Sequence, residues 1–218
     1  MSSRKDTAWE AGPRRLFRSP PWPYFCCNID AMRIGFCGSH RTGKTTLAEE
    51  VSRKAGMPFI RTCTSEVFRR AGLNPAAAMD FKKRLWIQTE TLEAAKGIWE
   101  AAGKSFITDR TPLDMMAYTL ADIQGATGAD FNEVEGYLER CFSITNSFFD
   151  ALVVVQPGIP LVHEQGKAAL NRAYMEHLNY LILGLAADPR LTAAVIRLAR
   201  GTVEMNERVR AVVEGLGL

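Results

Sequence analysis

Short apolar runs alternate with amphipathic stretches along most of the chain. Near-continuous apolar runs are typical of strands buried on both faces, whereas apolar positions three or four residues apart are typical of helices packed against such strands. The alternation predicts an α/β fold in three layers, with a central parallel sheet of about five strands flanked by helices. The predicted strands are 32–37, 58–62, 105–110, 151–157 and 193–198, and the predicted helices are 44–55, 64–71, 75–103, 112–123, 130–147, 168–187 and 202–215.

The first 31 residues do not share this pattern. They contain four of the ten prolines and show neither helical nor strand periodicity, so we expect a disordered or loosely docked extension. A misassigned start is an alternative, because a chain beginning at Met32 would be a complete domain. Trp9 and Trp22 leave a packed arm as a third alternative. The domain itself is predicted to comprise residues 32–218.

Length and composition fit one α/β domain. The chain has 218 residues, of which 47% are apolar, and this is enough for one sizeable core. The net charge is +3, and residues 1–31 hold five basic and three acidic side chains, so the rest is nearly neutral. Near-neutrality disfavours a protein whose main task is to coat nucleic acid. Arg69, Arg70 and 82–84 nevertheless form a local basic group, which is either a groove or a solvated helix face.

Targeting signals are missing from the sequence. No apolar run reaches the roughly 18–20 residues of a membrane span, so no membrane partner is expected. The opening stretch has no apolar region of the kind that secretory signals contain. The five scattered cysteines are typical of reduced thiols. We therefore expect a cytoplasmic protein, located in the host cytoplasm if a phage encodes it.

The segment GSHRTGKT, residues 38–45, matches the pattern G-x-x-x-x-G-K-[ST] between a predicted strand and a predicted helix. Glycines let the backbone curl so that its N–H groups point at phosphate oxygens, and the helix N-terminus adds its positive end. In such a loop the lysine reaches the β- and γ-phosphates and the hydroxyl after it ligates Mg²⁺. The predicted ATP-binding residues are Gly38, Ser39, His40, Arg41, Thr42, Gly43, Lys44, Thr45 and Thr46.

Two residues inside this phosphate loop are unusual. Arg41 is a fixed cation, and we expect it to neutralise charge that grows on the phosphoryl group during transfer, together with Lys44. His40 has two open interpretations: it hydrogen-bonds a substrate, or it only fills a spacer position.

A second candidate site follows the predicted strand 105–110. Asp109 lies at the carboxyl end of that strand, where parallel sheets collect their ligands, and it is expected to bind Mg²⁺ or to accept a proton from an attacking hydroxyl. Arg110 is expected to contact a substrate phosphate. Asp114, in contrast, is interpreted as a first-turn residue that interacts with the helix dipole.

Two further segments are candidates for substrate contact. Gln88 interrupts an apolar helix stripe, so its amide either reads the edge of a nucleobase or is satisfied within the core. Lys167 and Arg172 belong to a glycine-containing segment that is either a surface loop or a mobile lid. A lid would close over the phosphates and exclude water.

Together these residues resemble the nucleoside and nucleoside-monophosphate kinases, above all the thymidylate kinase group. They also resemble the AAA-type P-loop kinases that phages often encode. Thymidylate kinases commonly carry G-x-D-R-x-G-K-[ST], and the likeness, which runs from Met32 to the C-terminus, includes the arginine of this pattern. His40 replaces the family's aspartate, which contacts the substrate sugar, and this replacement disfavours thymidine monophosphate as the acceptor.

The resemblance also implies a three-layer P-loop NTPase fold with a mobile lid and roles for individual residues. The family's Asp-Arg pair corresponds to Asp109 and Arg110. A helix glutamine that reads the base corresponds to Gln88, and a substrate-binding arginine after the second strand corresponds to Arg61. The lid cations correspond to Lys167 and Arg172.

Three functions remain open from the sequence. The leading hypothesis is transfer of a phosphoryl group from ATP, with Mg²⁺, to a nucleoside, a nucleoside monophosphate or a related nucleotide. The second keeps this chemistry but places the acceptor, a hydroxymethylated pyrimidine such as 5-hydroxymethyluracil, within phage DNA. The third is a P-loop ATPase or nucleotide switch without a small-molecule acceptor. The preference for ATP over GTP and the oligomeric state, a homodimer included, are also open.

Overall fold

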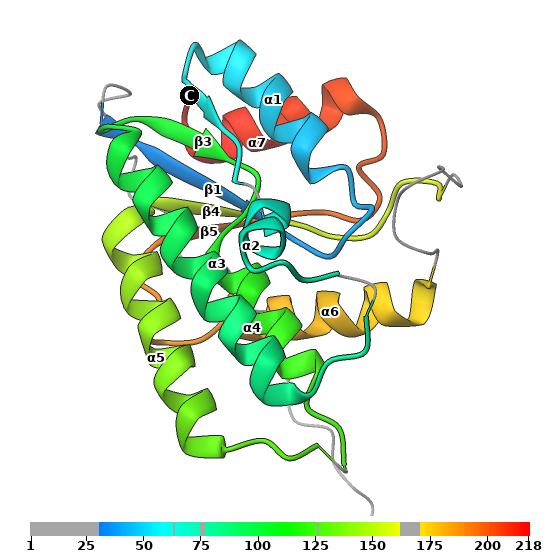
Figure 1. Cartoon of the computed structure of the whole chain (residues 1–218). Helices are drawn as coiled ribbons and strands as arrows, with labels where there is room; N and C mark the ends of the chain where they lie inside the picture. The colour runs from blue at the N-terminus through cyan, green and yellow to red at the C-terminus, as the bar shows by residue number, and fades with distance from the viewer. Residues whose placement is uncertain (1–30, 63, 75–76, 126, 162–170) are drawn as a thin grey trace, which may run out of the picture.

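A computed structural model gives the fold of residues 31–62, 64–74, 77–125, 127–161 and 171–218. Within these residues five parallel strands form one sheet in the order β2-β3-β1-β4-β5 (Figure 1). The predicted parallel sheet of five strands is therefore confirmed. The strands are β1 (Arg33–Cys37), β2 (Phe59–Ile60), β3 (Phe106–Thr108), β4 (Ala151–Val155) and β5 (Ala194–Leu198).

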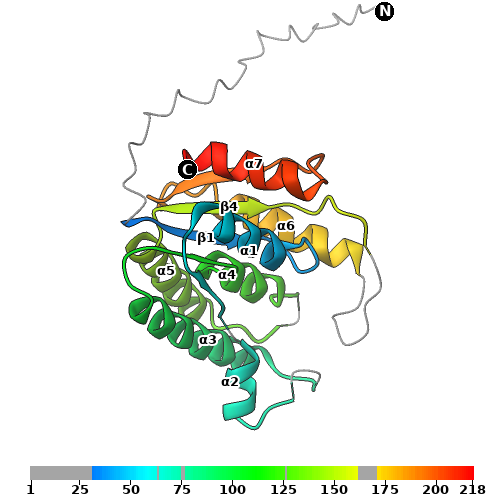
Figure 2. The same cartoon turned by 90° about the horizontal axis from the view of Figure 1, so that it is seen from above.

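Helices cover both faces of the sheet, which confirms the three layers. Helices α1 and α7 lie on one face, and α3 to α6 lie on the other (Figure 1). Helix α2 lies beside α3, on the side of the molecule remote from α7 (Figure 2). The helices are α1 (Lys44–Ala55), α2 (Thr64–Arg70), α3 (Phe81–Ala101), α4 (Pro112–Ala121), α5 (Phe131–Phe148), α6 (Arg172–Leu185) and α7 (Met205–Leu216).

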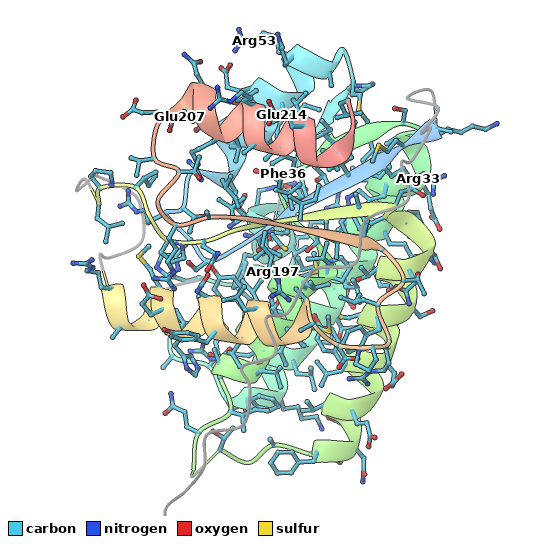
Figure 3. The ribbon with its side chains drawn as sticks, turned by 180° about the vertical axis from the view of Figure 1, so that it is seen from behind. Arg33, Phe36, Arg53, Arg197, Glu207 and Glu214 are labelled. Atoms are coloured by element: carbon cyan, nitrogen blue, oxygen red, sulfur yellow. The ribbon has the colours of Figure 1, made fainter. Side chains whose placement is uncertain are left out.

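The smaller of the two apolar cores lies between the sheet and the pair α1 and α7. Phe36 of β1 is fully buried there with Leu47 and Val212. Most charged residues of the two helices lie on the sides away from the sheet, as Figure 3 shows for Arg53 of α1 and Glu214 of α7. This division of apolar and charged positions is what a helix packed on a buried sheet requires.

Two helices begin later than predicted because a side chain caps each one. Helix α3 begins at Phe81 rather than near position 75, and the Asp80 side chain accepts a 2.7 Å hydrogen bond from the Lys83 amide. Helix α6 begins at Arg172 rather than near 168, and Asn171 accepts a 3.0 Å bond from the Tyr174 amide. Asp and Asn are preferred at this position because their oxygens satisfy amides that no helix carbonyl reaches.

The sheet topology places two loops side by side. β1 pairs with β3 on one side and with β4 on the other, so β1 is the point at which the chain changes direction across the sheet. Because all strands are parallel, the loops that follow β1 and β3 leave from the same edge. Ligands of open α/β sheets bind at such a switch point, outside the carboxyl ends of the strands.

Some predictions fall outside the described residues. They include the predicted extension before Ala31, and most of the predicted lid segment with Lys167. Among the described helices, none is long and apolar enough to cross a membrane.

Candidate active site

The phosphate loop, residues 38–45, begins where β1 leaves the core. Gly38 has a φ of 153°, and a Cβ on it would lie 2.2 Å from the carbonyl oxygen of Val155 at the end of β4. Arg41 and Gly43 both have left-handed backbones, with φ of 63° and 75°. Alternation of this kind lines a concavity with amides, as anion-binding loops require. The loop therefore has the backbone that its sequence motif predicts.

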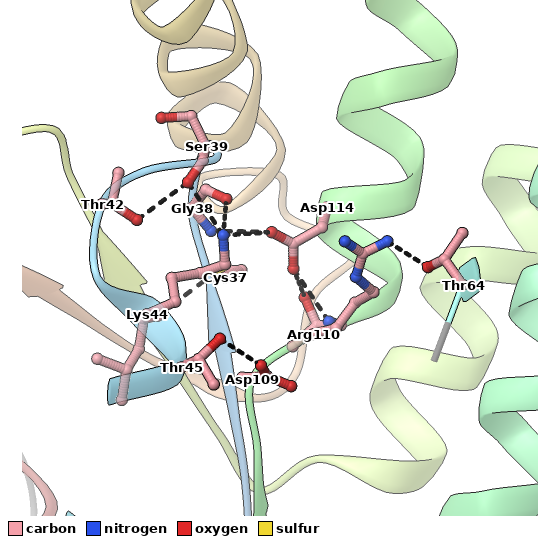
Figure 4. Close-up of polar contacts among 12 residues, drawn as sticks. Cys37, Gly38, Ser39, Thr42, Lys44, Thr45, Thr64, Asp109, Arg110 and Asp114 are labelled. Atoms are coloured by element: carbon pink, nitrogen blue, oxygen red, sulfur yellow. Dashed lines mark hydrogen bonds and ion pairs between the residues drawn. The ribbon is translucent and has the colours of Figure 1, made fainter. Parts of the chain in front are cut away.

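Lys44 folds back across its own loop. Its Nζ donates to the carbonyl oxygens of Gly38 at 2.5 Å and Ser39 at 3.0 Å, and it lies 3.8 Å from the Asp114 carboxylate (Figure 4). Burial lowers the pKa of Lys44, and the charge of Asp114 opposes that change. An ammonium group held by carbonyl oxygens is available to exchange them for phosphate oxygens.

Thr45 and Asp109 come together at the start of α1. The Thr45 hydroxyl donates a 2.5 Å hydrogen bond to Oδ2 of Asp109, the first residue after β3. A hydroxyl and a carboxylate side by side next to a phosphate loop fit Mg²⁺, which takes one or two carboxylates and completes its shell with phosphate oxygens and water. No group of three or more His, Cys, Asp or Glu side chains within the described part of the chain forms a metal cage.

Arg110 lies on the side of the site that faces α2. Its Nη1 donates a 2.6 Å bond to the hydroxyl of Thr64, the first residue of α2. Its guanidinium lies beside the Asp114 carboxylate (Figure 4), and its charge opposes the rise in the pKa of Asp114. A guanidinium at this position, between α2 and the loop, is suited to hold an anion that faces the γ-phosphate.

Asp114 has a larger structural role than its position in the sequence predicted. Its carboxylate is buried, with Oδ1 accepting from the Gly38 amide at 3.0 Å and Oδ2 accepting from the amide and hydroxyl of Thr111. Burial raises its pKa, while Lys44 and Arg110 act in the opposite direction. The capping-box spacing T-x-x-D was the available signal for the local part of this arrangement. Nothing in the sequence indicated the contact with Gly38.

His40 faces the beginning of α6. Its ring centroid lies 5.8 Å from that of Tyr174, at an interplanar angle of 37°. Burial lowers the pKa of His40, and the charges of Lys44 and Arg41 lower it further. The imidazole is therefore neutral at neutral pH, when it can still accept a hydrogen bond.

The remaining predicted substrate residues are more dispersed. Arg61 is exposed and binds Glu49 of α1 through a 2.6 Å hydrogen bond. Gln88 is half-buried on α3, between the buried Leu85 and Leu92. Arg172 is exposed at the first position of α6. The predicted roles of these three residues in substrate and lid contacts therefore stay proposals.

A family model described as an AAA domain matches residues 33–180. No curated protein matches the chain.

Several solved structures share the fold. A deoxyadenosine kinase from M. mycoides with dCMP and dCDP bound is 16% identical, with a TM-score of 0.61 over 85% of this chain and 99% of that one. NadR in complex with NAD and AMP-PNP is 16% identical, with a TM-score of 0.59 over 87% of this chain and 50% of that one. A thymidylate kinase from Ehrlichia chaffeensis is 17% identical, with a TM-score of 0.55 over 86% of this chain and 99% of that one. At these identities the likeness shows a common fold.

Proposed function

The chain belongs to the AAA domain family and has the fold of P-loop nucleoside and nucleotide kinases, and we propose that it transfers a phosphoryl group from ATP to a nucleoside, a nucleoside monophosphate or a related nucleotide. The observation that carries this proposal is the hydrogen bond between Thr45 and Asp109. It joins the phosphate loop to the end of β3, where a carboxylate can serve both the metal and the acceptor.

The residues of the loop supply most of the charge. Lys44 exchanges its bonds to two loop carbonyls for oxygens of the β- and γ-phosphates, and Arg41 adds a second cation. Thr45 and Asp109 would hold Mg²⁺, which neutralises charge on the phosphates when it is bound. Phosphoryl transfer needs mainly positioning and charge stabilisation, so this set is sufficient for the donor half of the reaction.

The acceptor half is assigned to the space between the loop and α2. Arg110 reaches Thr64 of α2 and provides a fork for a phosphate or hydroxyl oxygen of the acceptor. Neutral His40, beside Tyr174 of α6, offers a hydrogen-bond acceptor and an aromatic surface next to the loop. Asp109 accepts the proton of the attacking hydroxyl or orients it. One of the similar structures also carries dCMP and dCDP, which supports an acceptor of this size.

A second candidate function places the acceptor base in DNA. It is supported by a shallow surface hollow near the start of α3, lined by Asp80, Lys82, Lys83 and Trp86. Trp86 is 41% exposed, and the Lys83 ammonium lies 4.2 Å from the centroid of its ring. An exposed indole beside lysines is suited to stack on an unpaired base. Arg69 and Arg70 contribute less to such a surface, because both bind Glu66.

One experiment separates these functions. Purified protein receives labelled ATP and Mg²⁺ with nucleosides, with nucleoside monophosphates, or with DNA that contains 5-hydroxymethyluracil. Label in a nucleoside or monophosphate supports the proposal, and label only in DNA supports the second candidate. Steady release of free phosphate with no labelled acceptor would instead identify an ATPase or nucleotide switch.

Variants of one residue test the acceptor site in the same assay. Arg110→Met is expected to raise the KM for the acceptor about tenfold or more, because a charge-assisted contact is lost, and to leave the KM for ATP nearly unchanged. Arg53→Met is the matched control, since Arg53 is an exposed arginine of α1 that pairs with Glu50.

A further inference from the structure

Arg208 of α7 contacts the phosphate loop, although nothing in its sequence neighbourhood indicates a functional role. Its Nη2 donates a 2.9 Å hydrogen bond to the carbonyl oxygen of Thr42, which is 166 residues away in the sequence. Its Nη1 lies 3.1 Å from the place where a Cβ on Gly43 would stand. Arg208 therefore contacts the peptide between the two residues that precede Lys44.

Within the part of the chain that the structure describes, the guanidinium is buried without a compensating charge. Only 2% of Arg208 is exposed, and its Nε has no hydrogen-bond partner. Among the described residues no carboxylate forms an ion pair with Arg208, and burial alone lowers its pKa. Arginine remains charged under all ordinary conditions, so the protein buries a full positive charge against one carbonyl oxygen. An uncompensated buried charge is destabilising.

In the proposed function, the polyphosphate of the nucleotide supplies a negative charge near Arg208. The peptide that Arg208 contacts belongs to the loop that binds the polyphosphate in the proposed function. A triphosphate with its metal still carries net negative charge, and its attraction to a buried cation is strong because little water screens it. The same guanidinium also fixes the Thr42 carbonyl, and this orients the amide of Gly43 that follows.

We propose that Arg208 is a positioning residue of the donor site, whose charge is balanced only when the polyphosphate of the nucleotide binds to the loop. This inference rests on the proposed nucleotide binding and adds to it a residue from the far end of the chain. It predicts opposite effects on the free and the bound protein. Removal of the charge removes the cost of an uncompensated buried cation from the free protein, and it lowers the affinity for the polyphosphate.

The test compares Arg208→Met with the unchanged full chain. Melting temperature is measured without ligand, and affinity is measured by calorimetry for ATP with Mg²⁺ and for inorganic tripolyphosphate with Mg²⁺. Arg208→Met is expected to melt at or above the temperature of the unchanged chain. It is expected to bind both ligands about tenfold more weakly or worse, because the attraction between the buried charge and the polyphosphate is lost. Arg208→Lys keeps the charge and is expected to lose less affinity than Arg208→Met.

Arg210→Met is the matched control, because Arg210 is an exposed arginine of the same helix. It removes the same net charge and is expected to leave both affinities unchanged. A lower melting temperature or a failure of Arg208→Met to fold would overturn the inference, because Arg208 would then be a structural brace. Unchanged affinity for both ligands would overturn it, and so would weaker binding of ATP without weaker binding of tripolyphosphate. If the unchanged chain binds neither ligand, the proposed function itself fails.

Discussion

The carboxylate of Asp114 accepts a 3.0 Å hydrogen bond from the backbone amide of Gly38, the first residue of the phosphate loop. Its other oxygen binds the amide and hydroxyl of Thr111 at the start of α4. Lys44 lies 3.8 Å from the same carboxylate. One buried side chain thus connects helix α4, the beginning of the loop and the lysine that the loop presents to phosphates.

Asp114→Asn is expected to destabilise the folded protein by about 1–3 kcal/mol. An asparagine has only one acceptor oxygen, so its NH₂ group must face one of the amide donors that Asp114 now satisfies. The free energy of unfolding in urea measures the effect. Glu135→Gln, at an exposed position of α5, is the control and should stay within about 0.5 kcal/mol of the unchanged protein. Equal stability of the two variants would contradict the assigned role.

Gly38→Ala is expected to cost about 3 kcal/mol or more, because its Cβ would meet the Val155 carbonyl at 2.2 Å and backbone atoms cannot move aside easily. Gly56 provides a matched control. It also has a positive φ, of 68°, but no atom lies within 4 Å of an added Cβ. Gly56→Ala should therefore cost only about 1–2 kcal/mol, the strain of the left-handed backbone alone. Thermal and urea unfolding of both variants separate the steric part from the backbone part.

Thr45 and Asp109 are expected to act as one unit. Asp109→Asn should reduce turnover about 100-fold or more while sparing nucleotide affinity, and Lys44→Ala should abolish turnover. In the proposed function Thr45 and Asp109 would hold the same Mg²⁺, so Thr45→Val combined with Asp109→Asn should lose much less than the product of the single losses. Steady-state rates are measured across a magnesium titration for the unchanged protein, the two single variants and the double variant, which together form a double-mutant cycle. If the losses of rate multiply fully in the double variant, the two residues act independently. An unchanged rate for Asp109→Asn would exclude Asp109 from the mechanism.

His40 predicts a pH dependence of stability. Because its pKa in the folded protein is below the usual 6.5, the folded protein binds fewer protons than the unfolded chain at pH values just below 6.5. Stability therefore rises with pH across that window and is lost as the pH falls towards the folded pKa. Urea unfolding at a series of pH values should show this component in the unchanged protein and in His177→Gln, an exposed control on α6, but not in His40→Gln. The same pH profile in all three proteins would contradict it.

The sequence predicted the fold and the place of the phosphate loop within it. Strand and helix order, the parallel sheet and the loop between β1 and α1 were all predicted and are confirmed, as is the resemblance to P-loop nucleoside and nucleotide kinases. Asp109 was expected near the loop because carboxyl ends of parallel strands share one edge, and it bonds to Thr45. Each of these predictions depends on short segments whose apolar spacing or glycine content acts locally.

The positions at which helices begin and the partners of individual side chains were harder to predict from the sequence. The helix predicted from position 75 begins at Phe81, because the choice among several candidate caps depends on where the helix can pack. Arg61, assigned by resemblance to a substrate, binds Glu49 of α1, a contact that the sequence did not indicate. A side chain can reach any of several neighbours, and the sequence does not state which of them the fold places within reach.

Pattern and composition alone determined that this chain folds as a parallel α/β domain with an anion-binding loop after its first strand, because those features are encoded within a few consecutive residues. Only the tertiary structure decided that Asp114 holds Gly38 and that Arg208 holds Thr42. Both contacts join residues far apart in the sequence, and packing of helices α4 and α7 against the sheet is what brings their partners within hydrogen-bonding distance.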